Sequence, residues 1–76
     1  AGHDTSPSHQ AMKIEQLLRL TDAIAQLPDG QREAVVLHHL QGCSLADIAH
    51  ELRRTEPAIA GLLHRGLKRL RELMKE

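Results

Sequence analysis

A chain of 76 residues has room for one small domain with a thin hydrophobic core. Its Lys and Arg residues balance its Asp and Glu residues, and the single Cys43 excludes an internal disulfide, which suits a reducing cytoplasm. Phe, Tyr and Trp are absent, so single-strand nucleic acid binding by base stacking on aromatic rings is excluded. No apolar run approaches membrane-spanning length, and we expect no membrane contact.

The N-terminal segment lacks apolar periodicity and is rich in small polar residues. We therefore predict a disordered linker or tag remnant over residues 1–10 and one folded domain over residues 11–76. The first helix is expected from Met12 to Gln26, where apolar residues recur at helical spacing. Its apolar stripe consists of Ile14, Leu17, Leu18, Ile24 and Leu27.

A second helix is predicted to begin near Pro28, because proline suits the first turn, where its missing N–H group is not needed. It is expected to run to about Gln41, and Gly42 suits the cap that follows. Its inward residues are predicted to be Ala34, Val36, Leu37 and Leu40.

Two further helices are predicted on either side of a short break. Ser44 is a good N-cap for the third helix and Thr55 for the fourth, with Pro57 inside the fourth helix's first turn. Arg53 and Arg54 lie at the break. A capped short helix, a tight turn and a longer basic helix are typical of a helix-turn-helix, which presents one helix to a groove or a partner. No β-strand alternation occurs, so the expected fold is all-α, with four helices.

The fourth helix has two contrasting faces at 100° per residue. The face expected to pack on the domain carries Ile59, Leu62, Leu63, Gly66, Leu67, Leu70, Leu73 and Met74. The opposite face carries Pro57, Ala58, Ala60, Gly61, His64, Arg65, Lys68 and Arg71. Residues 53–76 hold seven Lys or Arg against three Glu. This surplus suits a polyanionic ligand, although a solvated helix face with mixed charge has the same composition.

Several of these segments together match a known pattern. They are Leu27-Pro28, Gln31-Arg32-Glu33 with Leu37, the run from Gly42 to Ala49, and the run from Leu63 to Arg71. From about Leu17 to Met74 the chain resembles region 4 of bacterial RNA polymerase sigma factors, most closely the extracytoplasmic-function (ECF) type.

The resemblance implies a four-helix domain of the sigma-4, winged-helix-like DNA-binding superfamily type, whose fourth helix docks in the major groove of the promoter −35 element. It also implies contact with the β-flap of the polymerase core and a possible anti-sigma partner. One alternative is a protein-interaction module of the same fold that binds the flap or an anti-sigma factor and binds DNA weakly. A response-regulator-type output domain is a third reading, although such domains usually lack this long terminal helix.

Two positions depart from the family pattern. The family commonly has Gly at the turn occupied by Arg53, which adds about 1 kcal/mol of strain if the site is left-handed. The family also places a Lys-Ser-Arg-like triplet where this chain has Ala60-Gly61-Leu62, and Ala and Gly cannot make the bidentate contacts by which Arg reads guanine. We expect contact of Ala58 or Ala60 with thymine methyl groups, basic side chains on phosphates, and modest sequence specificity.

The candidate DNA-contacting residues come from these faces and from the resemblance. Gln31 and Arg32 are either surface residues or phosphate contacts, and Ser44 is chiefly a cap whose helix N-terminus could also accept a phosphate. The full set is Gln31, Arg32, Ser44, Arg53, Arg54, Glu56, Ala58, Ala60, Gly61, His64, Arg65 and Lys68.

Catalytic and metal sites have little support. His38 and His39 are adjacent on a helix and therefore point about 100° apart, so they cannot readily chelate one ion. Asp47 and Glu51 lie four residues apart, but capping and a charged surface explain them better than a catalytic pair. We expect no enzymatic activity, no cofactor and no small-molecule substrate.

Overall fold

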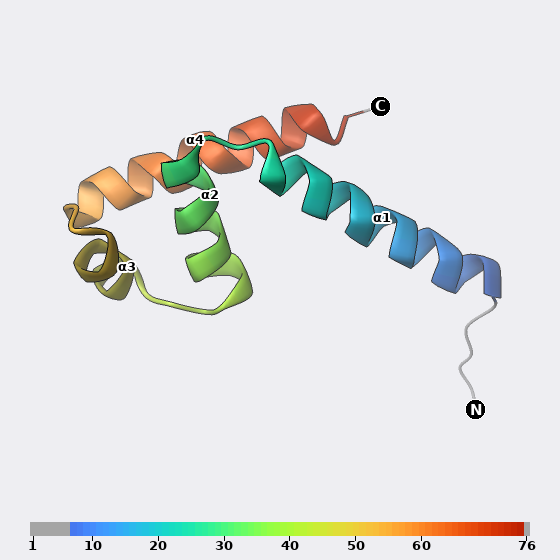
Figure 1. The fold of residues 1–76 in the computed structure, drawn as a ribbon, viewed down its shortest axis with the longest axis horizontal. Helices are drawn as coiled ribbons and strands as arrows, with labels where there is room; N and C mark the ends of the chain where they lie inside the picture. The colour runs from blue at the N-terminus through green and yellow to red at the C-terminus, as the bar shows by residue number, and fades with distance from the viewer. Residues whose placement is uncertain (1–6, 76) are drawn as a thin grey trace.

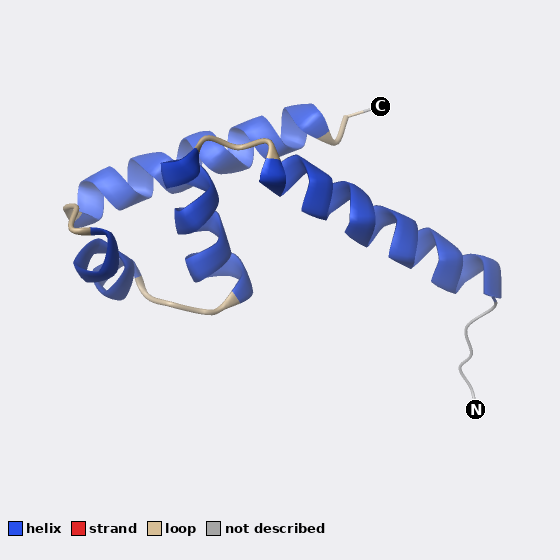
Figure 2. Ribbon diagram, in the orientation of Figure 1, coloured by secondary structure: helices blue, strands red, loops and turns tan. Residues whose placement is uncertain are grey.

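Helices joined by short loops make up the described chain. In the computed structural model, which describes residues 7–75 and their side chains from Ala11 onward, the elements are α1 (Pro7–Ala25), α2 (Asp29–Val35), the π-helix η1 (Val36–Leu40), α3 (Leu45–Leu52) and α4 (Glu56–Leu73) (Figure 1). Every regular element of this part of the chain is helical (Figure 2). The predicted all-α fold with a C-terminal helix-turn-helix is therefore confirmed.

Helix α1 begins earlier than the apolar pattern predicts. Its first residue is Pro7 rather than Met12, so residues 7–10, which we expected within the linker, form the first turn of the helix. Extending an existing helix is far easier than nucleating one, and proline disfavours helical geometry in the residue before it, which makes Pro7 a natural start. Residues 1–6 lie outside the described part of the chain, and their assignment as a linker stays a prediction.

The second predicted helix has the expected extent but changes type halfway. Its C-terminal half is the π-helix η1, in which the Gln41 N–H donates to the Val36 carbonyl five residues back, at 3.1 Å. Gly42 follows with φ of 73°, so the left-handed cap predicted there is present. The Cys43 N–H then donates to the Leu37 carbonyl at 2.9 Å, which closes this end of the helix.

The core lies where α2 and α3 pack against α4, as Figure 1 shows. Ile48 of α3 and Ile59 of α4 are the largest fully buried side chains. Gly66 allows a close approach of α4 to α2, because a Cβ at that position would lie 2.9 Å from Val35 Cγ2 and 3.6 Å from the Gln31 carbonyl oxygen. The buried apolar residues are Ala23, Leu27, Ala34, Val35, Ile48, Ala49, Ile59, Leu62, Leu63 and Leu70.

Helix α1 packs against the rest of the domain through its C-terminal half, where Arg19 donates to the Met74 carbonyl at 3.4 Å, and its N-terminal half extends away (Figure 1). Within it Ala23 is buried and Ile24 is half-buried, whereas every residue from Ala11 to Arg19 is exposed. The predicted stripe is therefore buried only near the turn into α2. Large apolar side chains that α1 leaves 58–62% exposed are Met12, Ile14, Leu17 and Leu18.

Candidate nucleic-acid interface

The turn between α3 and α4 is closed by two backbone hydrogen bonds. Arg53 adopts the left-handed conformation, with φ of 58° and ψ of 48°, so the strained geometry considered for this position is present. The Arg54 N–H donates to the Ala49 carbonyl at 2.9 Å and the Arg53 N–H to the His50 carbonyl at 3.3 Å, which is a Schellman motif. This closed turn fixes the direction in which α4 leaves α3.

Both predicted caps of the helix-turn-helix are present. The Ser44 hydroxyl accepts the Asp47 N–H at 3.0 Å, and the Thr55 hydroxyl accepts the Ala58 N–H at 3.2 Å. Each bond satisfies a backbone donor that the helix itself leaves free. Because Ser44 Oγ is used in this way, its structural role as a cap is established, whereas contact with DNA remains a prediction.

Helix α4 separates into the two faces that the sequence predicts. Its inner face is buried against the domain and includes Leu62, only 9% exposed, within the triplet that departs from the family pattern. On its outer face Ala58 and Gly61 are half-buried, and the exposed residues are Pro57, Ala60, His64, Arg65, Lys68 and Arg71. The described chain therefore leaves the outer face of α4 open to solvent.

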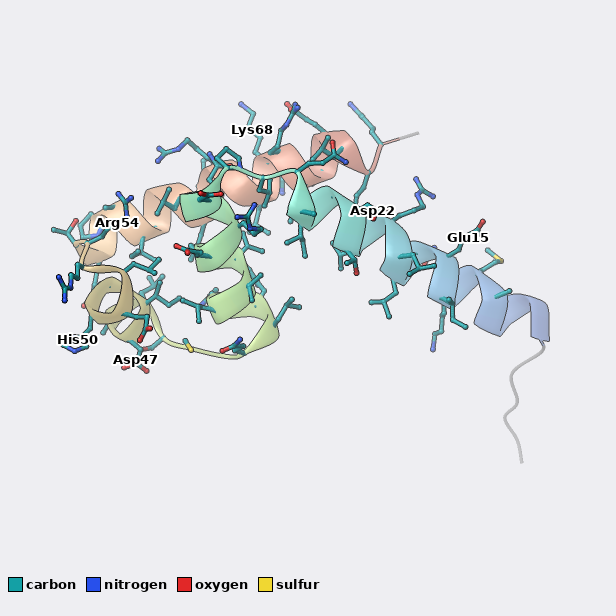
Figure 3. The ribbon with its side chains drawn as sticks, viewed as in Figure 1. Glu15, Asp22, Asp47, His50, Arg54 and Lys68 are labelled. Carbon is teal, nitrogen blue, oxygen red and sulfur yellow. The ribbon has the colours of Figure 1, made fainter. Side chains whose placement is uncertain are left out.

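Basic side chains gather where α4 passes the start of α2. Arg54 reaches across from the turn, since a Cβ on Gly30 of α2 would lie 3.9 Å from Arg54 Nη2. Figure 3 shows Arg54 near the beginning of α4 and Lys68 further along the same helix. One shallow depression is lined by Pro28, Gln31, Arg65, Lys68, Arg69 and Glu72. We call Arg54, Arg65, Lys68 and Arg69 the basic surface.

Most of the cations of the basic surface have no ion pair among the described residues. Arg69 lies 3.4 Å from the Glu72 carboxylate, an exposed pair that contributes little to stability. Arg54, Arg65 and Lys68 have no ion pair or side-chain hydrogen bond with any other residue that the structure describes. Exposed cations without carboxylate partners, of which Arg65 and Lys68 line one depression, suit an external anion such as the DNA backbone.

Two candidates on α2 have different surroundings. Gln31 is half-buried beside α4 and lines the same depression as Arg65, and its Oε1 is buried without a hydrogen-bond partner among the described residues. Arg32 instead donates to the Leu27 carbonyl at 3.1 Å and to Asp29 Oδ1 at 2.7 Å. It also faces a separate depression that includes Glu51, which makes phosphate contact less favourable there than at Gln31.

The remaining candidates lie near the two ends of the turn. Arg53 is exposed and lines a shallow depression with His50 and Arg54. Glu56, in the first turn of α4, is exposed beside the helix N-terminus, where its charge complements the helix dipole. A carboxylate repels phosphate, which disfavours direct contact of Glu56 with the DNA backbone. Its contact with DNA stays a prediction.

Sequence reasoning missed two features of this interface. Arg69 was left out although it lines the same depression as Arg65 and Lys68. The helical wheel places it on the side of α4 that faces α2, which could have suggested this position. The position of the Arg65 guanidinium over Gly61 was also missed. The only signal for it was the spacing of four residues between a glycine and an arginine.

No metal-binding or membrane-spanning element is found in the part of the chain that the structure describes. Within residues 11–75 no three His, Cys, Asp or Glu side chains come together in a way that could hold a metal ion. The His38 ring is instead engaged with the loop after η1, where its Nδ1 lies 2.9 Å from the Cys43 carbonyl oxygen. No helix among the described residues is long and apolar enough to cross a bilayer.

A capped helix-turn-helix with an open, partly basic second helix defines the helix-turn-helix class of DNA-binding domains. Comparison with known families gives a match to "Sigma-70, region 4" over residues 17–70. The chain therefore belongs to the sigma-70 region 4 family, and two of the three relatives described below are named as ECF sigma factors.

Curated relatives agree with this family. The chain is similar to the ECF RNA polymerase sigma factor SigX of Bacillus subtilis, with 33% identity over 91% of the chain and 36% of the relative. It is 47% identical to the RNA polymerase sigma factor CarQ of Myxococcus xanthus over 75% of the chain and 33% of the relative. It is 32% identical to the ECF RNA polymerase sigma factor BldN of Streptomyces coelicolor over 96% of the chain and 28% of the relative. The chain thus spans about a third of the length of these relatives.

Proposed function

We propose that this domain binds double-stranded promoter DNA, with α4 in the major groove of the −35 element, as part of an RNA polymerase holoenzyme. The observation that carries the proposal is the open outer face of α4, which the described chain does not cover. Family membership supports the same role, since the relatives are named as RNA polymerase sigma factors. The role is non-enzymatic, and it belongs in the cytoplasm, where bacterial promoters are found.

The chemistry of the surface suits binding that relies on the phosphate backbone. Arg54, Arg65 and Lys68 are exposed cations without intramolecular ion pairs among the described residues. Ala60 and Gly61 let the helix axis approach the bases closely, because their side chains occupy little of the groove. Phosphate contacts fix the position of a protein on the duplex and carry little sequence information. We therefore infer strong salt dependence and modest sequence specificity.

Titration of a −35 duplex at several salt concentrations tests this proposal. Three or four phosphate contacts give a slope of log K against log salt of about −3 to −4. Arg54→Ala should lower the affinity and reduce the slope by about 1, since it removes one phosphate contact. Lys13→Ala is the matched control, because Lys13 lies on α1, away from the turn. An affinity that does not vary with salt would reject the proposal.

A protein-binding role is a second candidate, and the exposed apolar side chains favour it. Met12, Ile14, Leu17 and Leu18 are all 58–62% exposed, so α1 presents several large apolar side chains within two turns, the kind of surface that a protein partner covers. The partner would be the polymerase β-flap or an anti-sigma factor. The double variant Arg54→Ala, Arg65→Ala separates the two roles. Promoter binding should be lost if α4 reads DNA, whereas affinity for a protein partner should be unchanged.

A further inference from the structure

His64 lies in the middle of α4, on the face that the rest of the described chain leaves open. At about 100° per residue it lies roughly 140° from the buried Ile59, so the side chain leaves the helix on the side away from the core. It is exposed, and its ring has no hydrogen bond, ion pair or ring contact with any other residue that the structure describes. Because the proposed function sets this face against a duplex, it also sets the imidazole beside DNA.

The other histidines whose side chains the structure describes are placed differently. His38 Nδ1 lies 2.9 Å from the Cys43 carbonyl oxygen, and the His39 ring packs edge-on against the His38 ring with centroids 4.8 Å apart. Both lie in η1, which packs on α2 and α3. His50 lies in α3 and lines a shallow depression together with the acid Glu51. None of these three rings lies on the outer face of α4.

The outer face of α4 is open, so the charged groups around His64 come from α4 itself. Arg65 follows it in the chain, and Lys68 lies one helical turn further on. The acids of the same helix, Glu56 and Glu72, are each eight residues away, which is about 12 Å along the axis. No described carboxylate lies within ion-pair distance of the ring. The anion that balances a positive charge on this imidazole therefore has to be a bound one.

Histidine differs from the other basic residues of this surface in how its charge responds to pH. It changes charge between about pH 5 and 8, whereas arginine and lysine stay protonated throughout this range. A neutral imidazole has one N–H donor, and a protonated one has two donors and a positive charge. A DNA phosphate attracts the protonated form, so the complex holds the proton more tightly than the free domain does. The affinity for DNA then rises as the pH falls.

We propose that DNA binding by this domain takes up a proton at His64, which makes the affinity for a −35 duplex higher in mildly acidic than in mildly alkaline solution. The inference rests on the proposed function and adds regulation to it, because the same surface then gains a cation as the pH falls. Uptake of one proton limits the change to about tenfold per pH unit, and we expect about 3- to 10-fold between pH 6 and 8. The added cation neutralises one more phosphate, so the slope of log K against log salt should be steeper by up to about 1 at the lower pH.

Titration at pH 6, 7 and 8 and fixed ionic strength tests the inference, with a duplex that the chain selects from a randomised −35 library. His64→Gln keeps a polar side chain that cannot become charged, so it should bind at every pH as weakly as the wild-type chain does at pH 8. His64→Arg carries a permanent charge and should bind at every pH as tightly as the wild-type chain does at pH 6. His39→Gln, in η1, is the matched control and should keep the full pH dependence. Circular dichroism at each pH checks that every variant is folded.

The outcomes separate this inference from the function on which it rests. A wild-type affinity that does not change with pH would overturn the inference, and so would a pH dependence that His64→Gln retains. Loss of the dependence in His50→Gln instead would assign the proton to α3 and overturn it as well. In each of these cases salt-dependent binding still supports the proposed function. If the wild-type chain shows no salt-dependent binding to any duplex at any pH, both fail together.

Discussion

Replacement of Gly66 by alanine tests the close packing of α4 against α2. The added Cβ would lie 2.9 Å from Val35 Cγ2, and Val35 is 2% exposed and stiff at χ1, so it cannot easily move away. Overpacking of this kind costs about 1–3 kcal/mol, and the better helix propensity of alanine returns about 1 kcal/mol. We expect Gly66→Ala to lower the free energy of unfolding by about 1 kcal/mol.

The effect of Gly66→Ala on the free energy of unfolding should change sign when Val35 is shortened to alanine. In a Val35→Ala background the clashing methyl group is gone, so Gly66→Ala should raise the free energy of unfolding by about 1 kcal/mol through helix propensity alone. The coupling between the two sites is then about 2 kcal/mol, within the range of contacting residues. Urea denaturation followed by circular dichroism measures all four variants, since the chain has no Trp or Tyr for fluorescence.

Gly61→Ala is the control for this cycle. Gly61 also lies within α4, but its added Cβ meets only the flexible end of Arg65, at 3.3 Å. It should therefore stabilise the domain by about 1 kcal/mol with or without Val35. An equal stabilisation by Gly66→Ala in both backgrounds would refute the close crossing of α2 and α4.

Three further predictions concern the turn and the start of α2. Ser44→Ala and Thr55→Ala should each lower the free energy of unfolding by about 1 kcal/mol in urea denaturation, and no change would mean that water replaces the caps. Arg53→Gly should raise it by up to about 1 kcal/mol, because relief of the left-handed strain, about 1–2 kcal/mol, exceeds the extra unfolded-state entropy of glycine. A lower melting temperature for that variant would contradict this balance. Asp29→Asn should lower the free energy of unfolding by no more than about 1 kcal/mol, since the Asp29 carboxylate that faces Arg32 is 88% exposed. A larger loss in the same assay would mean that this ion pair is stronger than its exposure indicates.

The parts of the fold that the sequence predicted are those set by local chemistry. Ser44 and Thr55 are caps because their hydroxyl groups can accept a backbone N–H three residues on, and the apolar period of α4 identifies its buried face. The left-handed turn at Arg53 could be anticipated only from the glycine that the family has there. These features depend on residue type and spacing, which a sequence states directly.

Other features depend on contacts that no local pattern encodes. The π-helical hydrogen bond from Gln41 to Val36 uses backbone groups that every residue has, so nothing in the residue types distinguishes it from an α-helical bond. The engagement of Arg32 with Asp29 and the Leu27 carbonyl depends on how the chain enters α2. Contact of any of the candidate residues with DNA is a proposal, and the titrations described above decide it.

The projection of α1 from the body of the domain has a consequence for its hydrogen-exchange behaviour. From Ala11 to Leu18 every side chain is exposed, so local opening there breaks backbone hydrogen bonds but uncovers no core. Amide protons in these turns should exchange much faster than those around Ile59, which are released only by global unfolding. The domain therefore combines a cooperative unit built on α4 with a helical arm that frays independently.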